Sequence, residues 1–401
     1  MNDNKISRRS FIAQNAALAG TALVSPAFIA AGQSSKKIRI GIVGGRFGST
    51  FQWHEHPGCI VEAVSDLRED RRKHLMQTYK CDKSYPSLGE MVKDKNIDAI
   101  GVFTGAPDHV KHVILCMKHG KHVISAVPAC GTLEEAEQLL EAVKKYGLTY
   151  MMAETGYYQQ HTISVRKMYR NGDFGDLYYV ESEYQHDGLD NLYFENGRRT
   201  WRYGMAPMLY PTHSTSLLIG VTGERLTEVV CQGWGDDAQC LKDNVYNNPF
   251  WNQSAFFKTD RGTSFRVNIW WKGAHLGGER ANWIGTKMSF YADNGRSGSA
   301  LVKKSDVLGK DDAGFVKSVP KLEDYEQPQW WSTDMLPEPL RHNSGHHGSH
   351  TFLTHEFIDA LINERQPTVN IHEALAYTVP GIVAHESALK GGVQLKIPQF
   401  I

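Results

Sequence analysis

The chain has 401 residues, of which 41% are hydrophobic and 22% are charged, and its formal net charge is zero. This length favours two domains, and the composition is that of an ordinary soluble globular protein. The balanced charge excludes the strongly basic chains that bind nucleic acid.

Residues 1–31 have the features of a twin-arginine export signal. Arg8 and Arg9 are followed by Phe11 and by an Ala-rich, weakly apolar stretch. That stretch is too short, and too rich in small residues, to form a stable membrane span. We therefore expect a periplasmic or otherwise exported protein without a membrane anchor; the alternative is an N-terminus that is not cleaved.

The six cysteines show no metal-finger spacing. The twin-arginine route carries proteins that have already folded, and a chain that folds in a reducing compartment usually keeps its thiols. We expect the cysteines to be small core residues.

Residues 36–155 alternate short β-rich runs, such as KIRIGIV and CIVEAVSD, with helical runs, such as HVKHVILCMKHGK. Alternating strands and helices are typical of a doubly wound parallel sheet. The sequence therefore predicts an α/β protein whose N-terminal domain, residues 36–155, is a Rossmann fold.

After residue 155, strand-like runs such as TSFRVNIWWKG and TKMSFYADN follow one another closely. This pattern predicts an α+β substrate-binding domain over residues 156–401, with a largely antiparallel open sheet and helices near the C-terminus. Residues 305–345 lack periodicity and contain four prolines, and we predict a long loop there.

A glycine-rich turn follows the first predicted strand, in the stretch IRIGIVGGRFGSTF. A dinucleotide fold needs glycines here because the backbone approaches the pyrophosphate closely. The spacing is not a regular G-x-G-x-x-G, and a strand–helix turn without a ligand is the alternative. The predicted cofactor-binding residues of this turn are Gly44, Gly45, Arg46, Phe47 and Gly48.

Asp66 ends the second predicted strand, 22 residues after Gly44. An acid at this place can bind both ribose hydroxyls of NAD. Arg68 nearby could instead receive the 2′-phosphate of NADP. We predict NAD as the cofactor.

The stretch LYPTHSTSLLIG places Tyr210 and His213 on either side of a proline, before a helix-like apolar run. Pro211 suits the first position of a helix. Both proton-moving side chains would then lie at a helix N-terminus, where the positive end of the dipole favours a neutral imidazole.

The stretch FTGAPDHVKHVILCMKHGKHVISAVPACGTLEEAEQL resembles the glucose–fructose oxidoreductase/inositol dehydrogenase/MocA superfamily. Thr104, Pro107 and His112 match the family's turn and helix. The resemblance implies an NAD- or NADP-binding Rossmann domain, hydride transfer at a sugar or polyol carbon, and a homo-oligomer. One position departs from the family, because Val127-Pro128 stands where its dehydrogenases have a catalytic lysine before the proline.

The Val-Pro pair together with YPTH resembles the NAD-dependent glycosidases of glycoside hydrolase family 109. This resemblance implies active-site roles for Tyr210, His213, Glu154 in MMAETGYY and Tyr184 in VESEYQHDG. It also places Val127 and Pro128 beside the cofactor. We further expect the sugar to contact His186, Trp201 and His347.

The resemblance implies oxidation of a sugar hydroxyl by bound NAD, elimination of the C1 substituent, addition of water and return of the hydride. Tyr210 or His213 would take a proton, and Tyr184 would assist. A sugar oxidoreductase without bond cleavage and a non-catalytic sugar-binding protein are the alternatives. The histidines of HNSGHHGSHTFLTH suggest a metal site only weakly, and we predict none.

Overall fold

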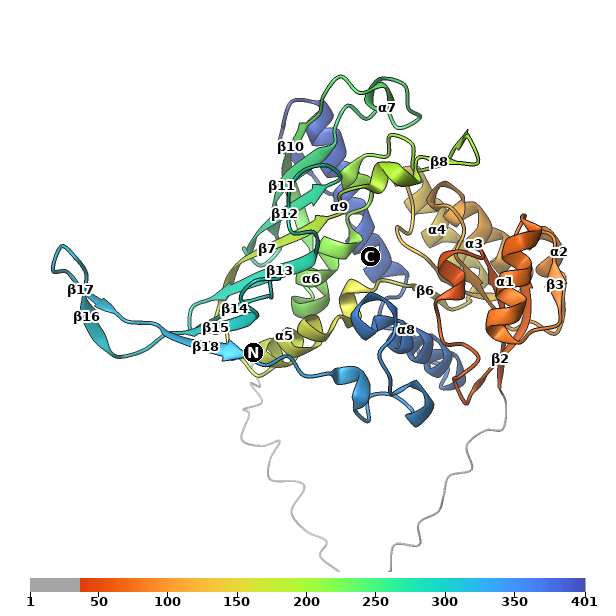
Figure 1. Cartoon of the computed structure of the whole chain (residues 1–401), viewed down its shortest axis with the longest axis horizontal. Coiled ribbons are helices and arrows are strands. Elements are labelled where there is room, and N and C mark those ends of the chain that lie inside the picture. Colours follow the sequence, from red (N-terminus) through yellow and green to blue (C-terminus); the bar gives the residue numbers. More distant parts are fainter. Residues whose placement is uncertain (1–36, 401) are drawn as a thin grey trace, which may run out of the picture. The chain divides into compact units, whose positions relative to one another are not determined.

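The computed structural model describes residues 37–400, so the predicted export signal lies outside the described residues. The N-terminal half forms a parallel sheet in the order β3-β2-β1-β4-β5-β6 (Figure 1). Both faces of such a sheet are covered, which explains why its strands are runs of apolar residues. The strands are β1 (Ile38–Val43), β2 (Cys59–Ser65), β3 (Ser84–Tyr85), β4 (Ala99–Val102), β5 (His122–Ser125) and β6 (Tyr150–Met152).

Helices connect these strands, as the alternating pattern predicts. Thr132 caps α4 by accepting a hydrogen bond from the backbone N–H of Glu135, and Gly147 ends that helix in the left-handed conformation. The connecting elements are η1 (Phe47–Ser49), α1 (Glu69–Tyr79), α2 (Leu88–Met91), η2 (Ala106–Asp108), α3 (His109–Lys118) and α4 (Leu133–Tyr146).

The C-terminal half forms a nine-stranded sheet in the order β18-β15-β14-β13-β7-β12-β11-β10-β19. All neighbouring strands in it are antiparallel except β7 and β12, so the predicted α/β class with a largely antiparallel second sheet is confirmed. Its strands are β7 (Leu177–Gln185), β10 (Leu226–Trp234), β11 (Asn252–Thr259), β12 (Ser264–Trp270), β13 (Gly278–Gly285), β14 (Met288–Tyr291), β15 (Ser299–Lys303), β18 (Lys321–Tyr325) and β19 (Leu395–Lys396).

One face of this sheet is covered by α5 (Gln160–Arg170), α6 (Thr212–Thr222) and α9 (Ile371–Leu389), as Figure 1 shows. The indole N–H of Trp283 on β13 donates to the carbonyl of Leu217 on α6, at 3.0 Å. The remaining helices are η3 (Gly156–Tyr158), η4 (Leu189–Leu192), η5 (Pro207–Leu209), α7 (Gln239–Lys242), η6 (Trp330–Ser332), η7 (Glu338–Leu340) and α8 (Gly345–Ile362).

Residues 305–345 are not the continuous loop that we predicted from the sequence. They contain the hairpin strands β16 (Leu308–Lys310) and β17 (Val316–Ser318), the edge strand β18, and two short 3₁₀ helices. Strands of three residues are too short to show an alternating pattern, and most of the hairpin is exposed.

All six cysteines lie within the described residues and none forms a disulfide; five are buried, which agrees with their predicted core role. Over residues 37–400, no helix combines the length and the apolar character needed to cross a membrane. A further two-stranded hairpin, β8 (Phe194–Glu195) and β9 (Arg198–Arg199), belongs to the C-terminal half.

Candidate active site

The glycine turn after β1 has a backbone that excludes larger residues. Gly44 has a φ of +103°, and a Cβ atom there would lie 2.2 Å from the carbonyl oxygen of Phe103. A Cβ at Gly45 would lie 2.7 Å from the Arg71 side chain, whereas Gly48 packs against Phe103. Gly44 and Gly45 also line a cavity, which suits the close approach of a pyrophosphate, whereas the predicted Gly48 does not line it and serves packing.

Asp66, at the end of β2, faces this turn. Its carboxylate accepts hydrogen bonds from the backbone N–H of Gly45, at 2.7 Å, and of Arg68, at 2.9 Å. The Arg68 guanidinium pairs with Asp70 and Glu195. An acid at the ribose position, beside an arginine already engaged by two carboxylates, fits NAD.

A cavity of about 1100 Å³ extends from the glycine turn to the second sheet. This volume, lined at one end by the glycine turn and at the other by titratable side chains, suits a dinucleotide together with a small substrate. Of the predicted residues, the cavity is lined by Gly44, Gly45, Arg46, Phe47, Asp66, Thr104, His112 and Val127, and by Tyr184, His186, Trp201, Tyr210 and His213.

Two predicted cofactor residues shape the backbone rather than line the cavity. Pro107 lies in η2, directly before α3, and the carbonyl oxygen of Pro128 lies 2.8 Å from Nδ1 of His109. Thr104 and His112 do reach the cavity, with 2.9 Å between the Thr104 hydroxyl and Nδ1 of His112.

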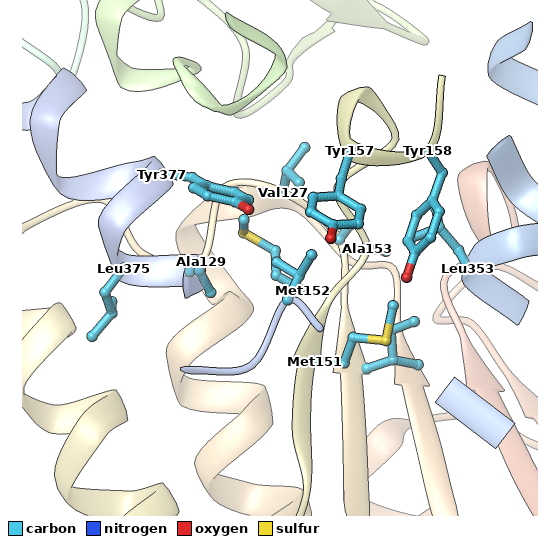
Figure 2. Close-up of a cluster of buried hydrophobic side chains, with 14 of the residues drawn as sticks. Val127, Ala129, Met151, Met152, Ala153, Tyr157, Tyr158, Leu353, Leu375 and Tyr377 are labelled. Atoms are coloured by element: carbon cyan, nitrogen blue, oxygen red, sulfur yellow. The ribbon is translucent and has the colours of Figure 1, made fainter. Parts of the chain in front are cut away.

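Val127 stands where the resemblance places a catalytic lysine. Figure 2 shows its side chain in an apolar cluster with Met152, Tyr157 and Tyr377. A valine in such surroundings neither holds nor moves a proton. Proton transfer in this cavity must therefore rely on other side chains.

A carboxylate–histidine–carboxylate cluster lies behind the wall of the substrate end; of its residues only His213 lines the cavity, whereas the predicted Glu154 is buried beneath it. Nδ1 of His213, in the first turn of α6, lies 3.0 Å from Oε1 of Glu154 and 3.7 Å from Oε2 of Glu279. The amide of Gln159 donates to Glu279, and the backbone N–H of Gly156 donates to Glu154 at 2.6 Å. With Nδ1 engaged by carboxylates, Nε2 is the ring nitrogen left for a substrate.

The charge of His213 differs from our sequence-based prediction of a neutral imidazole. Burial lowers the pKa of His213, but the nearby carboxylates of Glu279 and Glu154 outweigh that effect and raise the pKa to about 9. Two anions within 4 Å act more strongly than the helix dipole. His213 is therefore an imidazolium at neutral pH, and burial raises the pKa of Glu279.

Two tyrosines stand over this cluster. The Tyr184 ring makes an edge contact with His213, with 4.8 Å between centroids, and stacks on Tyr210 at 6.1 Å. Burial raises the pKa of Tyr184 well above its ordinary value and that of Tyr210 to about 12, although Arg202 acts in the opposite direction on both. Each hydroxyl is therefore protonated at rest and can donate a hydrogen bond.

An ion-paired strap connects the two halves of the cavity wall. Glu195, on β8, lies 2.9 Å from the Arg68 guanidinium and 2.5 Å from that of Arg71. All three side chains line the cavity. The second domain thus reaches over the cofactor end through a pair of salt bridges.

The family model described as an oxidoreductase family with an NAD-binding Rossmann fold, Gfo/Idh/MocA, matches residues 38–154. The match spans the parallel sheet from β1 to β6, including the glycine turn, and ends at Glu154. Residues 38–154 therefore form a Rossmann domain of the Gfo/Idh/MocA oxidoreductase type. The matched family model describes an NAD-binding domain.

Similarity to known proteins extends beyond this domain. A glycosyl hydrolase family 109 protein from Solibacter usitatus is 26% identical over 405 residues, covering 90% of this chain and 88% of that protein. One from Streptomyces coelicolor is 21% identical over 400 residues, covering 90% and 83%. The structure of scyllo-inositol dehydrogenase from Lactobacillus casei with NAD(H) and scyllo-inositol has a TM-score of 0.65 and 16% identity, covering 90% and 99% of the two chains.

Of the neighbouring histidines at the start of α8, His346 lines the cavity and the predicted His347 does not. Three successive left-handed residues, with φ values of +50°, +57° and +84° for His346, His347 and Gly348, break the start of α8. The break directs the two imidazoles differently, and the His346 ring stacks 6.4 Å from that of His213. Burial lowers the pKa of His346 to about 3, so it is neutral.

Glu279 was not among the residues predicted for this site. Glu279 lies directly opposite Tyr184 in the pairing of β13 with β7, and on the same face of β13 as the buried Ala281 and Trp283. An acid in register with buried apolar residues was the available signal. Arg202 and Trp271 also line the cavity and were not predicted.

The remaining predictions concern histidines and metals. His186 and Trp201 line the cavity, and Trp201 packs against Gly105 of the turn before η2. Within residues 37–400, no group of three or more histidine, cysteine, aspartate or glutamate side chains is arranged to hold a metal ion. His350, in the predicted histidine stretch, instead faces the carbonyl of Thr50 at 3.0 Å.

Proposed function

We propose that this Gfo/Idh/MocA protein is an exported glycosidase that keeps NAD bound and cleaves its substrate through oxidation and elimination. The observation that carries the proposal is the cluster of Glu154, His213 and Glu279 beneath Tyr184 and Tyr210. This arrangement provides proton-transfer groups in a cavity where Val127 replaces a catalytic lysine. Relatives named glycosyl hydrolase family 109 that match over 90% of the chain add support.

The reaction begins with oxidation of the hydroxyl on the ring carbon next to C2. When bound, NAD would accept a hydride from the sugar carbon and return it at the end of the cycle. The resulting ketone acidifies the C2–H bond, so that loss of this proton expels the C1 substituent. Water then supplies hydroxyl to C1 and a proton to C2, and the net change is hydrolysis.

His213 is suited to protonating the departing oxygen. It carries its proton at neutral pH, and Glu154 and Glu279 hold the ring through Nδ1. After giving up the Nε2 proton, the neutral ring can take a proton from the incoming water. Correctly placed acid–base groups of this kind accelerate a step by roughly 10² to 10⁴.

Tyr184 and Tyr210 complete the proton transfers in this proposal. Their stacked rings bring two hydroxyl-bearing side chains to the same wall of the cavity. We assign Tyr210 to the sugar hydroxyl or C2 proton and Tyr184 to orienting the ring, with His186 beside it at 6.0 Å between ring centroids.

Export supports a cycle that restores its own cofactor. The features of residues 1–31 favour transport of a folded protein, and free NAD is not dependably available outside the cytoplasm. A dehydrogenase that releases its cofactor would stall there. A glycosidase by elimination regenerates NAD in each turnover.

The second candidate is a sugar or polyol oxidoreductase that breaks no glycosidic bond. It is supported by the fold shared with scyllo-inositol dehydrogenase, whose structure contains NAD(H) and scyllo-inositol. The two candidates differ in whether a glycoside is cleaved without any added electron acceptor.

The deciding experiment incubates purified protein with a panel of nitrophenyl glycosides in deuterated water, without added NAD. Oxidation and elimination predict cleavage, with deuterium at C2 of the released sugar. Cleavage without deuterium would refute the mechanism, and no cleavage with slow redox turnover of sugars would favour the oxidoreductase. His213→Gln should abolish cleavage, and the exposed His74→Gln should not.

A further inference from the structure

Arg202 is a cation at the substrate end of the cavity that has no carboxylate partner in the described part of the chain. Its side chain lines the cavity, and it is close enough to the Tyr184 and Tyr210 hydroxyls to influence the pKa of both. Within residues 37–400, no Asp or Glu oxygen lies within 4 Å of its guanidinium.

Other arginines of the same cavity are neutralised. Arg68 and Arg71 both pair with Glu195, and Arg68 also pairs with Asp70. Arg46 is the cavity's other arginine without a carboxylate within 4 Å in the described chain, and it stands in the glycine turn, where the dinucleotide phosphates would lie. Unpaired arginines thus occur at the two ends of the cavity, one facing an expected anion and the other facing the substrate.

The Arg202 guanidinium is also held in a defined orientation. It lies 4.0 Å from the centroid of the Trp201 ring, and Trp201 in turn packs against Gly105. Stacking on an indole restricts the plane of the guanidinium and leaves its N–H groups available to other partners, of which the Tyr210 hydroxyl is one. A planar fork of donors matches a carboxylate, which it can bind through two parallel hydrogen bonds.

The hydroxyls of a neutral sugar could accept hydrogen bonds from this guanidinium but would bring no counter-ion to it. Binding a substrate displaces water from the cavity, and a charge that loses water without gaining a counter-ion is strongly disfavoured. An anionic substituent removes that cost.

We propose that the substrate is an acidic sugar whose carboxylate is bound by Arg202, so that the enzyme acts on glycosides of uronic acids. This inference rests on the proposed function for the reaction, but the recognition of the sugar can be measured separately. Arg202 is then the residue that selects uronides over neutral glycosides.

The test measures equilibrium binding of free sugars to the NAD-loaded protein by calorimetry. The panel contains D-glucuronate, D-galacturonate and D-mannuronate, each with its hexose and its uncharged uronamide. We expect at least one uronate to bind about 10- to 100-fold more tightly than both matched neutral sugars, the range of a charge-assisted pair. Equal affinities across all three matched sets would overturn the proposal.

Variants separate recognition of the carboxylate from an effect on Tyr210. In Arg202→Gln the preference for the uronate should fall to threefold or less, and Arg202→Lys should retain part of it. Arg198→Gln, which removes an exposed charge on β9 outside the cavity, should leave the preference unchanged. A uniform loss of affinity for uronate and hexose in Arg202→Gln would refute selection by charge.

The binding panel also contains sugars with a tetrahedral anion, hexose 6-phosphate and hexose 6-sulfate. If only hexose 6-phosphate or 6-sulfate bound tightly, the carboxylate assignment would be wrong. Because binding is measured rather than turnover, a uronate preference without glycoside cleavage would refute the proposed reaction and keep this inference. Cleavage of neutral glycosides without a uronate preference would support the proposed reaction and refute the recognition of uronates by Arg202.

Discussion

Glu279→Gln removes one of the two carboxylates that hold the proton on His213. The pair raises the pKa of His213 from 6.5 to about 9 against the opposing effect of burial. Since one pKa unit corresponds to about 1.4 kcal/mol, the protonated ring is stabilised by about 3 kcal/mol. With the charge at Glu279 gone and Glu154 left, we expect the pKa of His213 to fall by on the order of one unit or more.

The pH dependence of stability follows from the sign of this shift. His213 binds its proton more tightly in the folded than in the unfolded chain, so its contribution is complete below pH 6.5 and is lost as the pH rises toward about 9. In Glu279→Gln, the stabilising contribution of protonated His213 should disappear at a lower pH than in the wild-type protein. The pH at which deprotonation of His213 changes glycosidase activity should also be lower.

The assay is NMR titration of the imidazole together with chemical denaturation between pH 6 and 10. Glu181→Gln removes a carboxylate from the same sheet that pairs with Arg266, and it serves as the control because it should leave the pKa of His213 unchanged. An unchanged pKa of His213 in Glu279→Gln, or a pKa below 6.5 in the wild-type protein, would refute the proposed charge state.

Three further predictions concern the cofactor and the first turn of α8. Gly44→Ala should lose bound NAD and lower the melting temperature, because its Cβ would meet the Phe103 carbonyl; near-stoichiometric NAD released on unfolding the variant would contradict this. Asp66→Ala should weaken NAD binding by about tenfold while affecting NADP less, as measured by fluorescence titration. His346→Ala should reduce glycoside turnover more than His347→Ala, since only the His346 side chain lines the cavity; equal rates would contradict that placement.

The Rossmann half could be predicted from the sequence because its signals are local. Strand–helix alternation fixed the sheet, and the glycine turn and Asp66 are placed next to each other by consecutive strands. Tyr210 and His213 could also be located, because a proline before an apolar helix marks the start of α6. The resemblance then added Glu154 and Tyr184, which lie in the same site.

The charge state of the site depends on contacts between distant segments, which local patterns do not reveal. The neutral His213 that we expected follows from the helix dipole alone, whereas Glu279 reaches it from a strand more than sixty residues further along the chain. His346 and His347 are neighbours in the sequence, and only the left-handed backbone determines which one lines the cavity. The hairpin of β16 and β17 was missed because its strands are so short.

The strap formed by Glu195 with Arg68 and Arg71 has a consequence for how long the protein stays active. These three side chains line the cavity at the end where we expect the dinucleotide, and ion pairs near a surface weaken as salt rises. We expect separation of these pairs to ease the exit of the dinucleotide. Ionic strength should therefore set the residence time of NAD. For a protein that we propose to work where lost cofactor is not replaced, that residence time would be its operating lifetime.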